Sequence, residues 1–184
     1  MDFAALETFP HLETDRLILR RIETADAKAL LKLLSDREVL KTTDAPQLEN
    51  LEQANWLIEG LEGLFSTKAG IRWGITLKPK NTLIGTCGFN RFEYQHSHSG
   101  IGYELAKQYW GQGLMTEAVA AMVNYGFEAL QLNRIEALTI LDNIASIRVL
   151  QKLGFREEGI LREYIYAHDR YNDVRIFSLL KREK

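Results

Sequence analysis

The chain has 184 residues, 46% of them hydrophobic and 26% charged, which predicts one globular domain over 1–184 and excludes a collagen-like or low-complexity chain. Its formal net charge of −2, without a basic stripe, argues against a nucleic-acid-binding protein. The single cysteine, Cys87, cannot form an internal disulfide or a cysteine-based zinc site, and no leader or membrane-spanning run is evident, so we expect a cytoplasmic protein that does not bind membranes.

The first third of the chain predicts one strand and two helices. Arg16–Glu23 is rich in Ile and Leu and predicts a strand, after which Thr24 is expected to cap a helix that ends near residue 35. Asn50 followed three residues later by Gln53 resembles a capping pair. The helix that begins there carries an apolar stripe at helical spacing, formed by Ala54, Leu57, Ile58, Leu61, Leu64 and Phe65.

The middle of the chain predicts three strands and a long helix. Ile71–Leu77 and Thr82–Phe92 flank a turn that contains Pro and Asn. A polar loop, Tyr94–Ser99, leads into the strand Gly100–Leu105, and a glycine-containing turn leads into a helix at Leu114–Ala129.

The last third continues the mixture of strands and helices. We expect a strand at Arg134–Leu141, a helix at Asn143–Leu153 that Gly154 ends, and strands at Phe155–Tyr166 and Asp173–Leu180 on either side of a polar turn at His168–Asn172. Neighbouring strands interspersed with helices predict an α+β fold whose mixed, mostly antiparallel central sheet is flanked by helices.

The segment Gln108–Gly113 (QYWGQG) lies between a predicted strand and a predicted helix. Its two glycines let the backbone approach a ligand closely, and the free N–H groups of the following helix favour an anion such as a diphosphate. A turn without a ligand is the alternative. A dinucleotide fingerprint fails because Thr116 stands where Gly or Ala is required, and no Lys-Ser or Lys-Thr pair completes a phosphate-binding loop of the nucleotide hydrolases.

Asn143 and Ser146 form a second polar pair, at the start of a predicted helix. Asn143 is expected to cap that helix, and Ser146 could satisfy another backbone group of the same turn. Alternatively, the amide and the hydroxyl bind the polar chain of a ligand.

Together these segments resemble the GNAT superfamily of N-acetyltransferases. The family motif Gln/Arg-x-x-Gly-x-Gly/Ala is matched by Gln108, Gly111 and Gly113. The resemblance extends over about 12–182 and points to the RimJ/RimL-like branch, which acetylates the N-termini of ribosomal proteins. It is carried by the strings ETDRLILR (13–20), LIGT (83–86), GYEL (102–105), YWGQGLMTEA (109–118), NxxS (143–146) and KLGF (152–155).

The resemblance implies acetyl-CoA as donor and requires no metal. It places the pyrophosphate on backbone amides of the Gln108–Gly113 turn and of the helix start, and the pantetheine along the strand that ends in GYEL, with Asn143 on its other side. The residues expected to contact the donor are therefore Tyr103, Leu105, Gln108, Gly111, Gln112, Gly113, Leu114, Met115, Thr116, Asn143 and Ser146.

The resemblance also implies direct attack of a bound amine on the thioester, without an acyl-enzyme. Many members of the family carry a tyrosine that protonates the leaving thiolate at the position of Leu150 here, so this chain lacks that acid. We expect Ser146 to stabilise the leaving sulfur instead. Glu104 is the candidate general base, acting through a water, with a solvated or ion-paired carboxylate as the alternative. Cys87 is expected to be a small buried hydrophobic residue.

The acceptor predicted from the resemblance and from amine basicity is the α-amino group of a ribosomal or other protein. An α-amine is partly neutral at pH 7, whereas a lysine amine is almost wholly protonated, so an enzyme without a strongly tuned base suits the former. The alternatives are a small amine (an amino acid, a polyamine or an aminoglycoside) and a non-catalytic acyl-CoA-binding module. The acceptor loops Val39–Gln47 and Tyr94–Ser99 carry no readable code, and either a monomer or a homodimer is expected.

Overall fold

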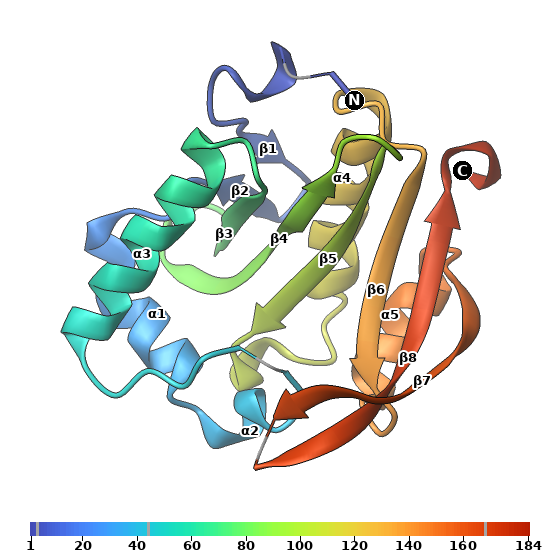
Figure 1. The fold of residues 1–184 in the computed structure, drawn as a ribbon. Helices are drawn as coiled ribbons and strands as arrows, with labels where there is room; N and C mark the ends of the chain where they lie inside the picture. The colour runs from blue at the N-terminus through green and yellow to red at the C-terminus, as the bar shows by residue number, and fades with distance from the viewer. Residues whose placement is uncertain (3, 44, 168) are drawn as a thin grey trace.

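An eight-stranded sheet in the order β1-β2-β3-β4-β5-β6-β8-β7 forms the centre of the computed structural model. The structure describes residues 1–2, 4–43, 45–167 and 169–184, so His168, the first residue of the predicted turn His168–Asn172, lies outside the described residues, as does residue 44 of the loop Val39–Gln47. Neighbouring strands pair antiparallel except β5 and β6, which pair in parallel. The predicted α+β fold with a mixed, mostly antiparallel sheet is therefore confirmed (Figure 1).

The strands are β1 (Leu12–Glu13), β2 (Leu17–Arg20), β3 (Ile71–Leu77), β4 (Leu83–Glu93), β5 (His98–Leu105), β6 (Arg134–Ile140), β7 (Arg156–Ala167) and β8 (Arg170–Leu180). The α-helices are α1 (Ala27–Leu34), α2 (Arg37–Leu40), α3 (Leu51–Ser66), α4 (Leu114–Glu128) and α5 (Ile144–Lys152). Short 3₁₀ turns lie at Ala4–Leu6, Thr24–Asp26, Lys107–Tyr109 and Lys181–Glu183. None of the helices in the described ranges is long and apolar enough to cross a membrane.

Two predicted helix caps are confirmed. The side chain of Asn50 accepts a hydrogen bond from the backbone N–H of Gln53 at 2.9 Å, and α3 begins at the next residue after Asn50. Asn143 caps α5 by accepting the backbone N–H of Ser146 at 3.0 Å. Gly154 follows α5 with a φ of +84°, a conformation that disfavours side-chain-bearing residues.

Four local predictions are wrong. Residues 170–172 of the expected polar turn His168–Asn172 belong instead to β8, where they pair with β7. Thr24 does not cap α1, because it begins a 3₁₀ turn whose cap is Glu23, and α1 follows from Asp26. His98 belongs to β5 and not to a loop, since it pairs with Glu93 of β4. Helix α2 was missed because its four residues are too few to show a period, and it occupies the first part of the expected loop Val39–Gln47.

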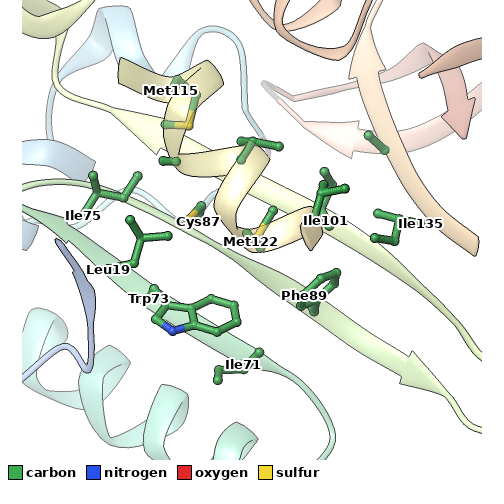
Figure 2. Packing of buried hydrophobic residues seen from close by; sticks show 14 of the residues in the cluster. Leu19, Ile71, Trp73, Ile75, Cys87, Phe89, Ile101, Met115, Met122 and Ile135 are labelled. Atoms are coloured by element: carbon green, nitrogen blue, oxygen red, sulfur yellow. The ribbon is translucent and has the colours of Figure 1, made fainter. Parts of the chain in front are cut away.

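Helices cover both faces of the sheet. α1 and α3 lie on one face and α4 on the other, while α5 packs beside β6 (Figure 1). The larger core lies between α4 and the sheet, where Met122 of α4 packs over Trp73, Phe89 and Ile101, all buried (Figure 2). A second cluster of apolar side chains lies beneath α1, α2 and α3.

Strands β5 and β6 separate before they end. Their parallel pairing runs from His98 opposite Arg134 to Ile101 opposite Ala137 and stops there. On its other side β5 remains paired with β4 as far as Leu105. The backbone of residues 102–105 therefore faces a gap where β6 would otherwise lie, and Figure 1 shows the two strands diverging toward their arrowheads. We call this opening the β5–β6 gap.

Gly126 tests the packing of α4 on the sheet. A Cβ atom there would lie 2.6 Å from Cζ of the buried Phe89 ring. Such overpacking costs about 3 kcal/mol and exceeds the gain of about 1 kcal/mol in helix propensity. We therefore expect Gly126→Ala to lower the free energy of unfolding in urea by about 2 kcal/mol. Gly60→Ala on exposed α3 meets no atom within 4 Å and is expected to stabilise instead; equal effects of the two changes would contradict this packing.

Candidate active site

A cavity of about 750 Å³ opens at the β5–β6 gap. Its wall includes residues from both faces of the sheet: leucines of α1 and α3 on one side, the start of α4 and the first turns of α5 on the other. Among the predicted site residues, those that line it are Tyr103, Glu104, Leu105, Gly111, Gly113, Leu114, Met115, Thr116, Asn143 and Ser146. Two predicted contacts, Gln108 and Gln112, are exposed and are not among the described residues of its wall.

The turn before α4 presents its backbone to this cavity. Gly111 and Gly113 have φ values of +73° and +75°, which glycine adopts without strain, and Gly113 is the N-cap of α4. The first helical hydrogen bond of α4 comes from Glu117 N–H to the Gly113 carbonyl, so the preceding N–H groups of the helix have no acceptor within it. Together with the positive end of the helix dipole, these groups favour an anion.

Arg16 attaches the first sheet strands to this turn. Its Nη1 donates to the Gln112 carbonyl at 3.0 Å, and its Nε donates to Glu117 Oε2 at 2.6 Å. The hydroxyl of Thr14 donates to the other oxygen of Glu117 at 2.5 Å. Glu117 would repel an anion bound at the start of α4, and the Arg16 guanidinium offsets that charge.

Glu104 lies in a buried polar network on the α1–α3 side of β5. Its Oε2 atom accepts hydrogen bonds from Arg72 Nη2 and from the Thr86 hydroxyl, the latter at 2.7 Å. Its Oε1 atom accepts one long hydrogen bond, from the Thr43 hydroxyl at 3.3 Å. Arg72 also donates to Asn90 at 3.0 Å. Glu104 is therefore an ion-paired carboxylate with one oxygen largely available to the cavity.

Tyr103 lies on the opposite face of β5 from Glu104, beside the start of α5. Its hydroxyl oxygen is 2.8 Å from Ser146 Oγ. Burial raises the pKa of Tyr103 to about 12, so its phenol is neutral and protonated at physiological pH. Asn143, which caps α5, also donates through Nδ2 to the Thr42 carbonyl at 3.0 Å and so links α5 to the segment after α2.

Cys87 is a buried hydrophobic residue, as predicted. It is fully buried, and burial raises the pKa of its thiol to about 12, so it is a poor nucleophile. Leu150, which stands where many relatives carry a tyrosine, is fully buried in the core.

Sequence reasoning missed Arg72 and Arg16. The signal for Arg72 was a lone charge in the otherwise apolar strand IRWGITL, but its partner is 32 residues away in the sequence. Arg16 stood in a string that matched the family, yet nothing local connected it with Glu117, 101 residues later.

Residues 16–156 match the family described as Acetyltransferase (GNAT) domain. The chain is 42% identical over 173 residues to a Bacillus subtilis (strain 168) protein named uncharacterized N-acetyltransferase YoaA, across 94% of this chain and 98% of that protein. It is 28% identical over 173 residues to the putative ribosomal N-acetyltransferase YdaF of the same organism, across 92% of this chain and 93% of that protein.

Solved structures show the same architecture. RimL, a ribosomal L7/L12 alpha-N-protein acetyltransferase in complex with coenzyme A, has a TM-score of 0.86 to this chain at 23% identity, over 93% of this chain and 98% of RimL. That likeness supports the fold, and the family match over residues 16–156 supports the chemistry. The chain therefore belongs to the GNAT family and is an acetyl-CoA-dependent N-acetyltransferase.

Proposed function

We propose that this enzyme transfers the acetyl group of acetyl-CoA to the α-amino group at the N-terminus of a protein, with ribosomal proteins as the first candidates. The observation that carries the proposal is the charge of the cavity wall. Among its described residues Glu104 is the one carboxylate, and Arg72 is already paired with it. The other charged side chains of the described wall, Arg148 and Lys152, are both basic.

The donor site fits acetyl-CoA, which supplies an acetyl group activated as a thioester. The free amides at the start of α4 suit the diphosphate, and the space above the two glycines leaves room for it. A Cβ at Gly111 would meet nothing within 4 Å, and one at Gly113 would meet Arg16 Nη2 at 3.6 Å. The unpaired edge of residues 102–105 suits the amide groups of the pantetheine chain. Asn143 and Ser146, at the start of α5, line the same cavity and would contact the pantetheine from its other side.

Glu104 is the proposed base for the acceptor amine, acting through a water at its Oε1 atom. Arg72 and Thr86 hold the other oxygen, which orients the carboxylate. A carboxylate is a weak base, so it suits an amine that is already partly neutral. At pH 7 about a tenth of α-amines are neutral, compared with fewer than about one lysine amine in 1,000.

Polycationic acceptors fit this wall poorly. A polyamine or an aminoglycoside carries several ammonium groups, each of which needs a carboxylate or water when the cavity closes around it. The described residues of the wall offer one carboxylate, that of Glu104, and three basic side chains, those of Arg72, Arg148 and Lys152. The leucines of α1 and α3 that line the cavity suit instead an apolar side chain next to a single amine.

The names of relatives agree with this acceptor. YdaF is named a putative ribosomal N-acetyltransferase, and RimL is a ribosomal L7/L12 alpha-N-protein acetyltransferase. Both are matched along more than nine tenths of this chain.

An acceptor comparison tests the proposal. The protein would be incubated with labelled acetyl-CoA and one acceptor at a time: ribosomal proteins, a peptide with a free N-terminus, the same peptide with its N-terminus blocked, a free amino acid, a polyamine or an aminoglycoside. We expect label on ribosomal proteins and on the free peptide, located at the α-amine by mass spectrometry. Preferential labelling of the polyamine or the aminoglycoside would contradict the proposal.

Gly113→Val tests the donor cradle, by which we mean the Gln108–Gly113 turn together with the free amides at the start of α4. Valine at a φ of +75° strains the turn, and its branched side chain covers the amides at the start of α4. We expect calorimetry to show coenzyme A binding at least tenfold weaker. Gly60→Val, on the exposed face of α3, is the matched control and should bind normally. Wild-type affinity in a folded Gly113→Val protein would refute the cradle.

Glu104→Gln tests the base. Below about pH 8 the acceptor α-amine is mostly protonated and needs a base, whereas at higher pH it is neutral without help. We therefore expect kcat to fall by roughly 10²-fold near pH 6.5, with a loss that shrinks above pH 8.5. The measurement is a pH–rate profile at saturating acetyl-CoA, accompanied by thermal unfolding of the variant. A loss of equal size at every pH would assign Glu104 to acceptor binding instead.

A further inference from the structure

Two hydroxyl groups from different elements meet at the cavity wall. Tyr103 projects from β5 and Ser146 from the first turn of α5, and their oxygens are 2.8 Å apart. Sequence reasoning assigned Tyr103 to donor binding alone, so this pairing was not expected.

We propose that Tyr103 is a positioning residue that donates a hydrogen bond to Ser146 Oγ, so that the serine directs its own hydrogen at the sulfur leaving acetyl-CoA. The proposal rests on the proposed function, because it needs the thioester in the β5–β6 gap. It gives Tyr103 a role in the rate of transfer in addition to any contact with the donor.

The hydrogen bonds around Ser146 leave its hydroxyl free for this task. The cap of α5 uses the backbone N–H of Ser146 and the side chain of Asn143, so the serine hydroxyl is not needed to satisfy the helix end. The hydroxyl of Tyr103 lies near two oxygens, Ser146 Oγ at 2.8 Å and the Ser146 carbonyl at 3.5 Å. Either hydroxyl can donate in the shorter contact, and the proposal assigns the phenol hydrogen to it, since a contact of 3.5 Å is too long for a good hydrogen bond.

The pKa of Tyr103 shows that its hydroxyl donates a hydrogen bond and does not pass its proton on to the leaving thiolate. Burial raises the pKa of Tyr103 to about 12, compared with about 8.5 for an ordinary thiol. Moving the phenol proton to a thiolate is therefore unfavourable by about 3.5 pK units, a factor of roughly 3,000. Tyr103 remains a neutral donor throughout, and its hydrogen bond orients the serine.

The reaction balances without a change in either hydroxyl. A C–N bond forms between the acceptor amine and the acetyl carbon, and the C–S bond breaks with its electron pair going to sulfur. An acceptor that arrives as an ammonium loses two protons: the first passes through water to Glu104, and the second leaves the nitrogen for solvent as the amide forms, while the thiolate takes one proton from solvent. Ser146 and Tyr103 stabilise the negative charge that develops on sulfur and end as they began.

Tyr103→Phe, Ser146→Ala and the double variant test the pairing. We expect kcat to fall about 10²-fold for Ser146→Ala, as for the loss of one preorganised donor. Tyr103→Phe should lower kcat about tenfold, and the double variant should be no slower than Ser146→Ala, because the tyrosine acts through the serine. Coenzyme A affinity, measured by calorimetry, should change less than twofold in all three.

Tyr125→Phe is the matched control. Its hydroxyl donates to the Ala5 carbonyl at 2.5 Å, and burial raises its pKa to about 12 as well, but it is not among the described residues of the cavity wall. Removing this hydroxyl should lower stability without changing kcat.

The outcomes separate this inference from the proposed function. If the wild type transfers acetyl to no α-amine, the proposed function fails. If the wild type is active and Tyr103→Phe retains its kcat, or if its loss adds in full to that of Ser146→Ala, the inference is overturned. A fall in coenzyme A affinity with kcat intact also overturns it. Should Tyr103→Phe not fold, 3-fluorotyrosine at position 103, a stronger donor, should raise kcat, and an unchanged or lower kcat overturns the inference.

Discussion

The separation of β5 from β6 is the constraint on which the rest of the site depends. Pairing stops at Ile101 and Ala137, although each strand continues for several residues. A closed sheet would place the two faces of β5 in separate compartments. The β5–β6 gap joins them, so that Glu104 on one face and Tyr103 on the other line a single cavity. The proposed base and the proposed donor of hydrogen bonds to the leaving group could then act on one substrate from opposite sides.

Contacts from several elements fix the positions of the strand end and of the turn beside this opening. β5 remains paired with β4 as far as Leu105, and Trp110 donates to the Leu105 carbonyl at 2.6 Å, which closes the turn onto the strand. Arg16 and Glu117 tie the same turn to the N-terminal strands. On the other side, apolar side chains of α4 pack against the sheet (Figure 2), and this packing fixes where the helix begins beside the gap. The cradle is therefore supported from three elements that are distant in sequence.

Local signals in the sequence predicted much of the fold. The caps Asn50 and Asn143 and the glycines of the turn before α4 act within a few residues, and they lie where the sequence placed them. The candidate site residues lie together, because Glu104, Ser146 and most of the expected donor contacts line one cavity, while their roles stay predictions. The residues that pair with these candidates could not be predicted from the sequence. The Arg72–Glu104 ion pair and the Tyr103–Ser146 contact join residues 32 and 43 positions apart, and only tertiary packing decides such pairs.

A crystal structure of the protein with coenzyme A tests the central claim most directly, since the account makes the β5–β6 gap the donor site. It predicts the diphosphate on the amides at the start of α4, the pantetheine beside residues 102–105, and the sulfur within hydrogen-bond distance of Ser146 Oγ. Coenzyme A bound outside the gap, or with its sulfur remote from both Ser146 and Glu104, would contradict the account.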